Sequence, residues 1–454
     1  MLKLSDTAIY LNGRHCGHDV EFTTVGSDSR TIVPGMLFVA LKGDKFDGHD
    51  YVQSALDQGA AAALVCHVFA DANPTLPLVA VNDARIALGQ LAANWRSRFH
   101  APLLGITGSN GKTTVKEMCA AILRADFGQN AVLATSGNLN NDIGLPLTLL
   151  KLRGTHHAAV IEMGMNHAGE IAYLTNIAQP TVALVNNAQR AHLAGLGSVT
   201  AIARAKGEIF AGLARDGVAV INADDPHAPL WRELAAGHRI LSFGFQQTAD
   251  VCGHWHAHGF GGQLTLTTPQ GEISVQLSVP GEHNARNALA AAAACLAAGV
   301  PLAPIVRGLE HFSNAKGRLQ RKAGLNGATI IDDSYNANPD SMRAAINVLA
   351  TLPGRRIFVM GDMGEVGETA GQMHSEIGGY AKSQGIDGLL AIGEMSSAAV
   401  HDFDGGGQHF GSVEALVKAL KPQLDKETTV LVKGSRFMRM ERVVEQIMEA
   451  GHAA

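Results

Sequence analysis

The sequence has few aromatic residues and no excess of positive charge. Only 5% of its 454 residues are aromatic and the formal net charge is −5, so a basic surface with stacking platforms for nucleic acid is not indicated. The longest apolar run, Ala288 to Val300, has 13 residues, fewer than the roughly 20 that cross a bilayer. We therefore exclude nucleic-acid binding and a membrane span, and expect anionic substrates to be bound locally.

The chain also has few cysteines, and they are scattered: Cys16, Cys66, Cys119, Cys252 and Cys295. Their number is odd and no Cys-x-x-Cys pair occurs, so a disulfide scaffold is excluded and a reducing compartment is the simplest interpretation. The first ten residues include the acidic Asp6 and lack a sustained apolar core, unlike a secretory signal. We therefore expect a cytoplasmic protein.

Hydrophobic residues and glycine, in contrast, are abundant. Hydrophobic residues make up 46% of the chain and charged residues 17%, which is typical of a folded protein and not of a disordered one. At roughly 150 residues per domain, the length predicts about three domains. We place the boundaries near residues 99 and 313, which gives domains over residues 1–99, 100–313 and 314–454.

Strand and helix patterns alternate through all three segments, which predicts an α/β fold. Residues 31–65 read as a strand, a polar loop, a helix and a second strand, and a helix is expected over residues 84–99. The central segment predicts a parallel, doubly wound sheet, because helical stretches separate its apolar strands. Those strands are expected at residues 103–107, 158–163, 181–186 and 218–222.

Two later stretches have patterns of their own. Residues 245–280 alternate as half-buried strands do, which predicts an antiparallel appendage to the central domain, before an alanine-rich helix from residue 285. The third segment predicts a Rossmann-like sheet, and Gly405 to Gly407 are expected to form a loop tip. The strands of that sheet are expected at residues 328–331, 357–360, 389–392 and 429–432.

The strongest local signal is a glycine-rich turn between a strand and a helix, Gly-Ile-Thr-Gly-Ser-Asn-Gly-Lys-Thr-Thr at residues 105–114. Glycines let backbone amides turn toward phosphate oxygens, and the helix N-terminus adds partial positive charge. Lys112 would reach the terminal phosphates and the Thr113 hydroxyl would bind Mg²⁺. The turn predicts a nucleotide triphosphate site formed by Gly108, Ser109, Asn110, Gly111, Lys112, Thr113 and Thr114.

The turn departs from the common Gly-x-x-x-x-Gly-Lys-Ser/Thr pattern, because Ile106 stands where the first glycine would be. The bland alternative is a chance match of Gly-Lys-Thr, but the preceding strand, the following helix and the extra glycines favour phosphate binding. A dinucleotide-binding fingerprint is excluded, since Thr107 stands where that fingerprint needs glycine.

Four further motifs accompany this turn: Gly-Asn-Leu-Asn-Asn at 137–141, Glu-Met-Gly at 162–164, Gly-Glu-His-Asn at 281–284 and Asp-Asp-Ser-Tyr-Asn-Ala-Asn-Pro at 332–339. Together they resemble the Mur ligases of peptidoglycan synthesis, over essentially the whole chain. The resemblance implies an ATP-dependent amide ligase whose first domain binds a UDP-sugar and whose last domain closes over ATP.

Within that family, the motifs resemble most the members that join D-alanyl-D-alanine to UDP-N-acetylmuramoyl-tripeptide. The stretches that favour this branch include residues 28–30, 47–49, 361–368 and 433–441. The Asp-Asn-Pro-Arg motif with which many MurE members hold diaminopimelate is absent. The alternatives are a MurE ligase, a folylpolyglutamate synthase, or a nucleotide-switch binding protein that has the same loop but catalyses no ligation.

The resemblance also implies catalytic and cofactor roles. Two Mg²⁺ sites are expected, with Thr113, Glu162, His192 and a carbamylated Lys206 as ligands. Asn287 would contact adenine, Asp333 would hold the ribose, and Arg318 would reach the γ-phosphate. The catalytic residues are therefore expected to be Lys112, Glu162, His192, Lys206 and Arg318.

Substrate contacts are implied in the same way. The uracil and diphosphate would meet Ser29, Arg30, Asp47 and His49, and the muramoyl-peptide would meet Asn138, Asn140 and Asn141. The incoming amine and tripeptide would meet near Tyr335, Asn336, Lys433, Ser435 and Arg436. We expect a monomer without nucleic-acid partners. His254, His256 and His258 could ligate a metal, but a solvent-facing strand is the favoured interpretation.

Overall fold

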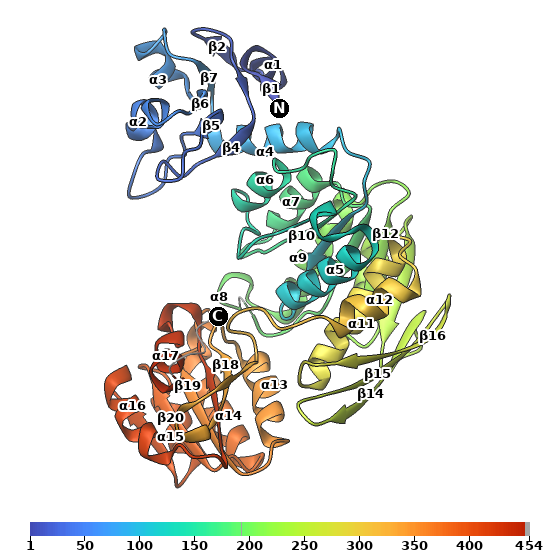
Figure 1. The fold of residues 1–454 in the computed structure, drawn as a ribbon, viewed down its shortest axis with the longest axis vertical. Helices are drawn as coiled ribbons and strands as arrows, with labels where there is room; N and C mark the ends of the chain where they lie inside the picture. Colours follow the sequence, from blue (N-terminus) through green and yellow to red (C-terminus); the bar gives the residue numbers. More distant parts are fainter. Residues whose placement is uncertain (192, 450–454) are drawn as a thin grey trace.

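The computed structural model of the protein describes residues 1–191 and 193–449. Three α/β units follow one another along its long axis, from the N-terminal unit in blue to the C-terminal unit in orange and red (Figure 1). Their main sheets have five, nine and six strands in chain order. The predicted α/β fold class with a doubly wound central sheet is confirmed. The domain boundaries at residues 99 and 313 stay a prediction.

The N-terminal unit has a sheet in the order β2-β7-β6-β5-β4, in which β4 to β7 are parallel and β2 is antiparallel. A short antiparallel pair, β1 and β3, lies beside it. Its strands are β1 (Leu2–Lys3), β2 (Arg14–Cys16), β3 (Glu21–Phe22), β4 (Thr24–Gly26), β5 (Met36–Val39), β6 (Ala62–Cys66) and β7 (Leu78–Val81). Its helices are α1 (Leu4–Tyr10), α2 (Val52–Asp57), α3 (His67–Ala72) and α4 (Ala84–Arg96).

The central sheet has the order β16-β15-β14-β13-β12-β11-β8-β10-β9. The predicted antiparallel β-rich appendage is confirmed, since β14, β15 and β16 pair antiparallel. It extends the central sheet, because β14 also pairs in parallel with β13. The strands are β8 (Leu103–Thr107), β9 (Val132–Ala134), β10 (Ala158–Glu162), β11 (Val182–Val185), β12 (Val218–Asn222), β13 (Arg239–Gly244), β14 (Val251–His258), β15 (Gly261–Thr268) and β16 (Gly271–Leu277).

Helices cover this sheet on both faces, as apolar parallel strands require. Two of them, α5 and α11, pack against each other on one face of the sheet. The alanine-rich helix begins at Glu282, three residues before the predicted start. The helices of the unit are α5 (Lys112–Phe127), α6 (Gly144–Leu149), α7 (Glu170–Ala178), α8 (Leu193–Leu196), α9 (Val199–Gly207), α10 (Ala228–Leu234), α11 (Glu282–Ala297) and α12 (Leu302–Glu310).

The C-terminal sheet has the order β17-β18-β22-β19-β20-β21, parallel except for β17. The predicted loop tip is wrong at Gly407, which begins the edge strand β21; Gly405 and Gly406 do turn the chain. The strands are β17 (Gln320–Ala323), β18 (Thr329–Asp333), β19 (Arg355–Gly361), β20 (Gly388–Ile392), β21 (Gly407–Phe410) and β22 (Thr428–Lys433). The helices are α13 (Pro339–Ala350), α14 (Ala370–Ser383), α15 (Ser397–Phe403), α16 (Val413–Leu420) and α17 (Glu441–Ile447).

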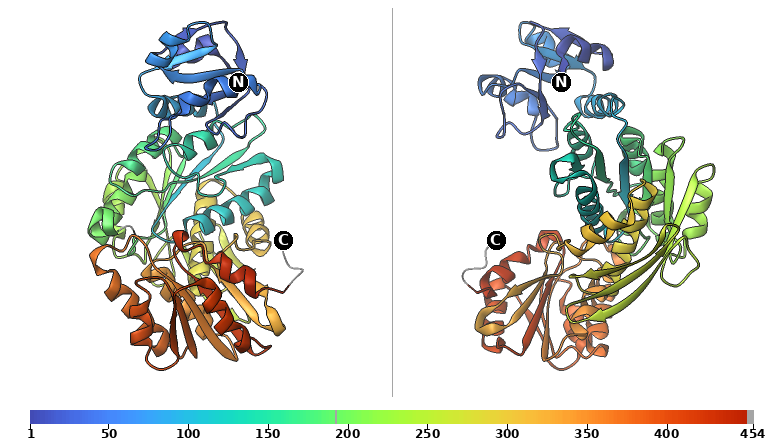
Figure 2. Two further views of the ribbon diagram at one scale, coloured as in Figure 1. Left: turned by 90° about the vertical axis from the view of Figure 1, so that its left-hand side faces the viewer. Right: turned by 45° about the vertical axis from the view of Figure 1, so that its right-hand side comes forward.

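The three units do not divide the hydrophobic core equally. One apolar cluster runs from the N-terminal unit into the central unit, joining residues such as Leu88, Leu91 and Leu149. The C-terminal unit has two clusters of its own and packs below the central unit (Figure 2). Across the described residues, no helix combines the length and hydropathy needed to cross a bilayer.

Candidate functional site

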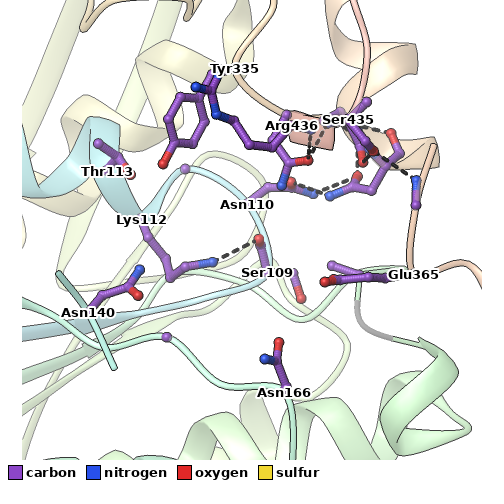
Figure 3. Close-up of a pocket in the computed structure, with 18 of the residues that line it drawn as sticks. Ser109, Asn110, Lys112, Thr113, Asn140, Asn166, Tyr335, Glu365, Ser435 and Arg436 are labelled. Carbon is purple, nitrogen blue, oxygen red and sulfur yellow. Dashed lines mark hydrogen bonds between the residues drawn. The ribbon is translucent and has the colours of Figure 1, made fainter. Parts of the chain in front are cut away.

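A cavity of about 600 Å³ lies between the central and C-terminal units. Its central wall is the phosphate loop and the ends of neighbouring strands, and its C-terminal wall is formed by the segments at 333–338 and 433–437 (Figure 3). The carboxyl edges of two parallel sheets therefore face each other across it, which is where open α/β sheets bind ligands. Predicted site residues that line it include Ser109, Asn110, Gly111, Lys112, Thr113, Asn140, Asn141, Glu162, Arg318, Asp333, Tyr335, Asn336, Lys433, Ser435 and Arg436.

The phosphate loop leads directly into α5. Gly111 has a φ of +79° at the N-cap, and a Cβ there would lie 2.3 Å from Asn287 Oδ1, so only glycine fits. Lys112 Nζ donates to the carbonyl oxygens of Gly108, at 2.7 Å, and Ser109, at 3.2 Å. Desolvation lowers the pKa of Lys112. The Lys112 ammonium group thus lies against carbonyl oxygens of the phosphate loop, in the place where it would bind phosphate oxygens.

Glu162 ends β10 and gathers the groups around it. Its Oε2 accepts from Thr113 Oγ1 at 2.9 Å, and its Oε1 accepts from Asn140 Nδ2 at 2.8 Å. The Glu162 side chain is nearly buried, with 3% of the residue exposed. A carboxylate next to a threonine hydroxyl is the hard oxygen donor set that Mg²⁺ prefers, so the residues present fit that ion.

Lys206, on α9, is a buried lysine, with 1% of the residue exposed. Burial, and then the nearby Lys112 cation, hold its pKa well below the usual value. Among the described residues, no hydrogen-bond acceptor or carboxylate pairs with its amine. His192, the other predicted ligand on this side, lies outside the described residues.

A second cavity, of about 350 Å³, adjoins the first behind the phosphate loop. Asn287 lines it, and its Oδ1 accepts from Asn186 Nδ2 at 3.0 Å. Thr114 is also part of its wall. Burial, and then the charge of Lys433, lower the pKa of His283 to about 4, so a neutral imidazole lines this cavity at neutral pH. The polar, amide-rich wall suits a nucleobase edge.

The C-terminal wall is held by one buried ion pair. Lys433 Nζ donates to Asp333 Oδ2 at 2.5 Å and to the Asn336 carbonyl oxygen at 2.9 Å. Burial raises the pKa of Asp333, although Lys433 opposes the shift. Arg318 stacks over the Tyr335 ring at 4.4 Å and donates to Thr113 Oγ1 at 3.0 Å, so it bridges the two units.

Ser435 and Arg436 follow β22 at the cavity mouth. Ser435 Oγ donates to the Ala337 carbonyl oxygen and accepts from the Gly364 amide. The exposed Arg436 guanidinium pairs with Glu441 at 2.9 Å. Both side chains therefore face the space in which a second substrate would enter (Figure 3).

The predicted sugar-nucleotide residues lie in the N-terminal unit and line neither cavity. Arg30 forms a two-pronged pair with Asp28 and is exposed beside Ser29. The ring of His49 is held at both nitrogens: Nε2 accepts from the Cys66 amide, which leaves Nδ1 to donate to Asp47 at 2.5 Å. His49 and Asp47 therefore order their loop. Gly108, Asn138 and Lys206 also lie outside the two cavity linings.

Sequence reasoning missed the segment after β11. Asn187, Gln189 and Arg190 line the cavities and contact the phosphate loop or the C-terminal unit. Their place at the carboxyl end of a central strand was the available signal. The three histidines of β14, His254, His256 and His258, are exposed, as the strand interpretation predicted. In the described part of the chain, no cluster of three or more His, Cys, Asp or Glu side chains is close enough to hold a metal.

Three family profiles match the chain in order. They are the Mur ligase family catalytic domain over residues 21–96, the Mur ligase middle domain over 106–295, and the Mur ligase glutamate ligase domain over 317–436. The protein therefore belongs to the Mur ligase family.

Similar proteins include one curated relative and two solved structures. The UDP-N-acetylmuramoyl-tripeptide–D-alanyl-D-alanine ligase of Escherichia coli (strain K12) is 43% identical over 452 residues, 99% of this chain and 98% of its own length. A crystal structure of MurF from Acinetobacter baumannii has 37% identity, a TM-score of 0.89 and 97% coverage of both chains. The MurF ligase of Thermotoga maritima in complex with ADP has 28% identity, a TM-score of 0.81 and coverage of 93% and 96%.

Proposed function

We propose that this protein is an ATP-dependent ligase that joins D-alanyl-D-alanine to UDP-N-acetylmuramoyl-tripeptide in the synthesis of peptidoglycan precursors. The curated relatives that carry this name match it over almost their whole length, which excludes a shared fragment. The observation that carries the proposal is the cavity in which the phosphate loop and Glu162 face Lys433 and Arg436 of the other sheet.

The chemistry follows from what the two walls offer. A carboxylate is a poor electrophile, so the tripeptide carboxylate must first attack the γ-phosphorus of ATP, which expels ADP and gives an acyl phosphate. The amine of D-alanyl-D-alanine then attacks the acyl carbon, and phosphate leaves. Both steps move charge more than they need a protein nucleophile, and Lys112 and Arg318 are the cations placed to stabilise it.

Thr113 and Glu162 would hold Mg²⁺ beside the phosphates, and this ion would neutralise negative charge on the transferred group. The Glu162 carboxylate is held in position for this role, because it accepts hydrogen bonds from Thr113 and Asn140. We propose that His192 and a carbamylated Lys206 would hold a second Mg²⁺.

The carbamate proposal is supported by the setting of Lys206. A buried ammonium without an acceptor, near a second lysine, is unfavourable, and it would repel a cation. Reaction of the neutral amine with CO₂ releases one proton and leaves a carbamate, which has the negative oxygens that a metal needs. The change in charge would also compensate Lys112.

Asn287 would meet adenine, Asp333 the ribose and Arg318 the γ-phosphate, while the first domain, residues 1–99, would bind the UDP-sugar. Arg30 is free to reorient toward a diphosphate because its pair with Asp28 is exposed. The amine would bind near Ser435 and Arg436. We propose a monomer, since one chain supplies both walls of the cavity, and a cytoplasmic reaction, since ATP is consumed.

The test is a phosphate-release assay that crosses UDP-muramoyl peptides of two, three and four residues with glutamate, diaminopimelate, lysine, D-alanine and D-alanyl-D-alanine. Release that requires the tripeptide and D-alanyl-D-alanine together supports the proposal. Preference for diaminopimelate with the dipeptide would assign the chain to another branch, and release without any amine would identify a nucleotide hydrolase.

A further inference from the structure

The segment Asn186 to Arg190, which we call the 186–190 segment, follows β11 and lies against the phosphate loop. The Ser109 amide donates to the Asn187 carbonyl oxygen at 3.0 Å, and the Gln189 amide donates to Ser109 Oγ at 2.9 Å. The Asn110 amide donates to Asn187 Oδ1 at 2.9 Å. Three hydrogen bonds, each with a backbone amide as donor, therefore tie the position of the loop to this segment.

The last residue of the segment crosses to the C-terminal unit. The Arg190 amide donates to Asp340 Oδ2 at 2.8 Å, and its guanidinium donates to Asp340 Oδ1 at 2.8 Å. The same guanidinium reaches both oxygens of Glu376, on α14, at 3.1 Å. The Arg190 and Asp340 side chains are only 28% and 23% exposed, so solvent screens the pair less than it screens a surface ion pair.

Asp340 is itself well placed to receive this contact. It lies in the first turn of α13, where the helix dipole favours a carboxylate. The N-cap of the same helix, Asn338, donates from Nδ2 to Asn110 Oδ1 of the phosphate loop at 2.7 Å. The start of α13 therefore touches the loop directly through Asn338 and indirectly through Arg190.

The residues immediately before α13 line the active-site cavity. Asp333, Tyr335 and Asn336 all belong to this stretch, and Lys433 is bonded to two of them. A shift of the first turn of α13 would move these groups relative to Lys112. No other arginine in the described residues pairs with both α13 and α14 from the central unit.

We propose that Arg190 is a positioning residue for the ligase reaction: by pairing with Asp340 and Glu376, it sets the C-terminal wall of the cavity against the phosphate loop. The role rests on the proposed function, since it concerns the same site. Arg190 acts indirectly, through α13 and the 186–190 segment, when the two walls of the cavity are in contact. Its loss should therefore lower turnover. It should not weaken the binding of the sugar nucleotide to the first domain.

The experiment compares wild type, Arg190→Lys, Arg190→Ala, Asp340→Asn and the Arg190→Ala/Asp340→Asn double variant. We expect kcat to fall about tenfold or more in Arg190→Ala and less in Arg190→Lys, with KM for the UDP-muramoyl-tripeptide within about twofold of wild type. The double variant should be no slower than Arg190→Ala, because both changes break one contact. Arg85→Ala is the matched control, since Arg85 pairs with Asp142 across the other junction, and it should keep wild-type kcat.

Small-angle X-ray scattering of the ligand-free full-length variants gives a readout besides activity. Arg190→Ala should have a larger radius of gyration than wild type, and Arg85→Ala should not. Wild-type kcat in Arg190→Ala, additive losses in the double variant, or identical scattering would each overturn the proposal. If wild type fails to ligate D-alanyl-D-alanine, the proposed function is wrong, and the scattering comparison still decides whether Arg190 sets the domain arrangement.

Discussion

The two junctions between the units differ in the kind of contact that forms them. At the first, α4 packs its buried leucines and Trp95 against α6 and α7 of the central unit in one continuous apolar core. At the second, hydrogen bonds and ion pairs cross between the units, as in the pairs of Arg190 with Asp340 and of Arg318 with Thr113. The turn between β14 and β15 is an exception, because its Phe260 packs against the C-terminal core.

This difference has a physical consequence. Separating the first junction would expose buried side chains that contribute about 1.5–3 kcal/mol each. Separating the second would exchange hydrogen bonds that contribute about 0.5–3 kcal/mol net for bonds to water. We therefore expect the N-terminal unit to stay fixed on the central unit and the C-terminal unit to be the one that opens and closes.

Trp95→Ala tests the apolar junction and should have the largest effect on stability. Trp95 is 8% exposed and its Nε1 donates to the Leu152 carbonyl oxygen at 3.1 Å. We expect the free energy of unfolding to fall by about 3–5 kcal/mol in chemical denaturation. Ile86→Ala, on the same helix but 53% exposed, is the control and should change little. Equal effects of the two variants would mean that this junction is not a shared core.

Lys112→Ala tests the cation of the phosphate loop, at the polar junction. Phosphate release should fall by about two to three decades, equivalent to about 3–4 kcal/mol of transition-state stabilisation, with an unchanged melting temperature. The pairing of a large kinetic loss with no loss of stability is the opposite of what Trp95→Ala should show. Wild-type turnover in Lys112→Ala would contradict the assignment of this loop as the site that binds the phosphates of ATP.

Lys206→Ala tests the carbamate. We expect a loss of turnover of about two decades, partly restored by short-chain carboxylates that supply a negative oxygen. Lys206→Arg keeps the cation but cannot be carbamylated, so added carboxylate should not restore it. The direct measurement is an intact-protein mass under CO₂, in which wild type and not Lys206→Arg gains one CO₂. Full activity of Lys206→Arg would return Lys206 to a structural role.

His283 should give the smallest effect, seen in the pH dependence of stability. Its pKa is about 4 in the folded chain, against 6.5 for an ordinary histidine. The unfolded chain therefore binds a proton that the folded chain does not, so the stability it contributes is complete above pH 6.5 and is lost as the pH falls toward 4. The slope is at most about 1.4 kcal/mol per pH unit. His283→Gln should flatten this slope, and an unchanged slope would contradict the assignment.

The elements that the sequence predicted correctly are those marked by residues close together in the chain. The strand at 103–107, the phosphate loop and the helix after it were predicted because glycines and apolar runs mark them within a dozen residues. The edge strand β21 was missed because it is four residues long, follows two glycines and begins with a third. The continuity of β14 with β13 depends on a pairing that begins at Phe243 and Val251, which no local pattern announces.

Site residues that belong to sequence motifs could be predicted, whereas contacts between the central and C-terminal units could not. Glu162 and Thr113 follow recognisable motifs and lie in contact, at 2.9 Å between Oε2 and Oγ1. The contact of Arg190 with Asp340 joins residues 150 positions apart, in different units. No sequence motif links the two positions. Such contacts depend on how the units dock.

The proposed reaction begins when the carboxylate of the muramoyl peptide attacks ATP at the polar junction. The most direct measurement uses tripeptide substrate labelled with ¹⁸O in that carboxylate, with D-alanyl-D-alanine and ATP, and analyses the released phosphate by mass. If the carboxylate attacks ATP, each released phosphate should carry one labelled oxygen, because the carboxylate oxygen stays on phosphorus when the amine attacks. Unlabelled phosphate would show that water attacks ATP, as in a nucleotide switch, and would contradict the acyl-phosphate mechanism.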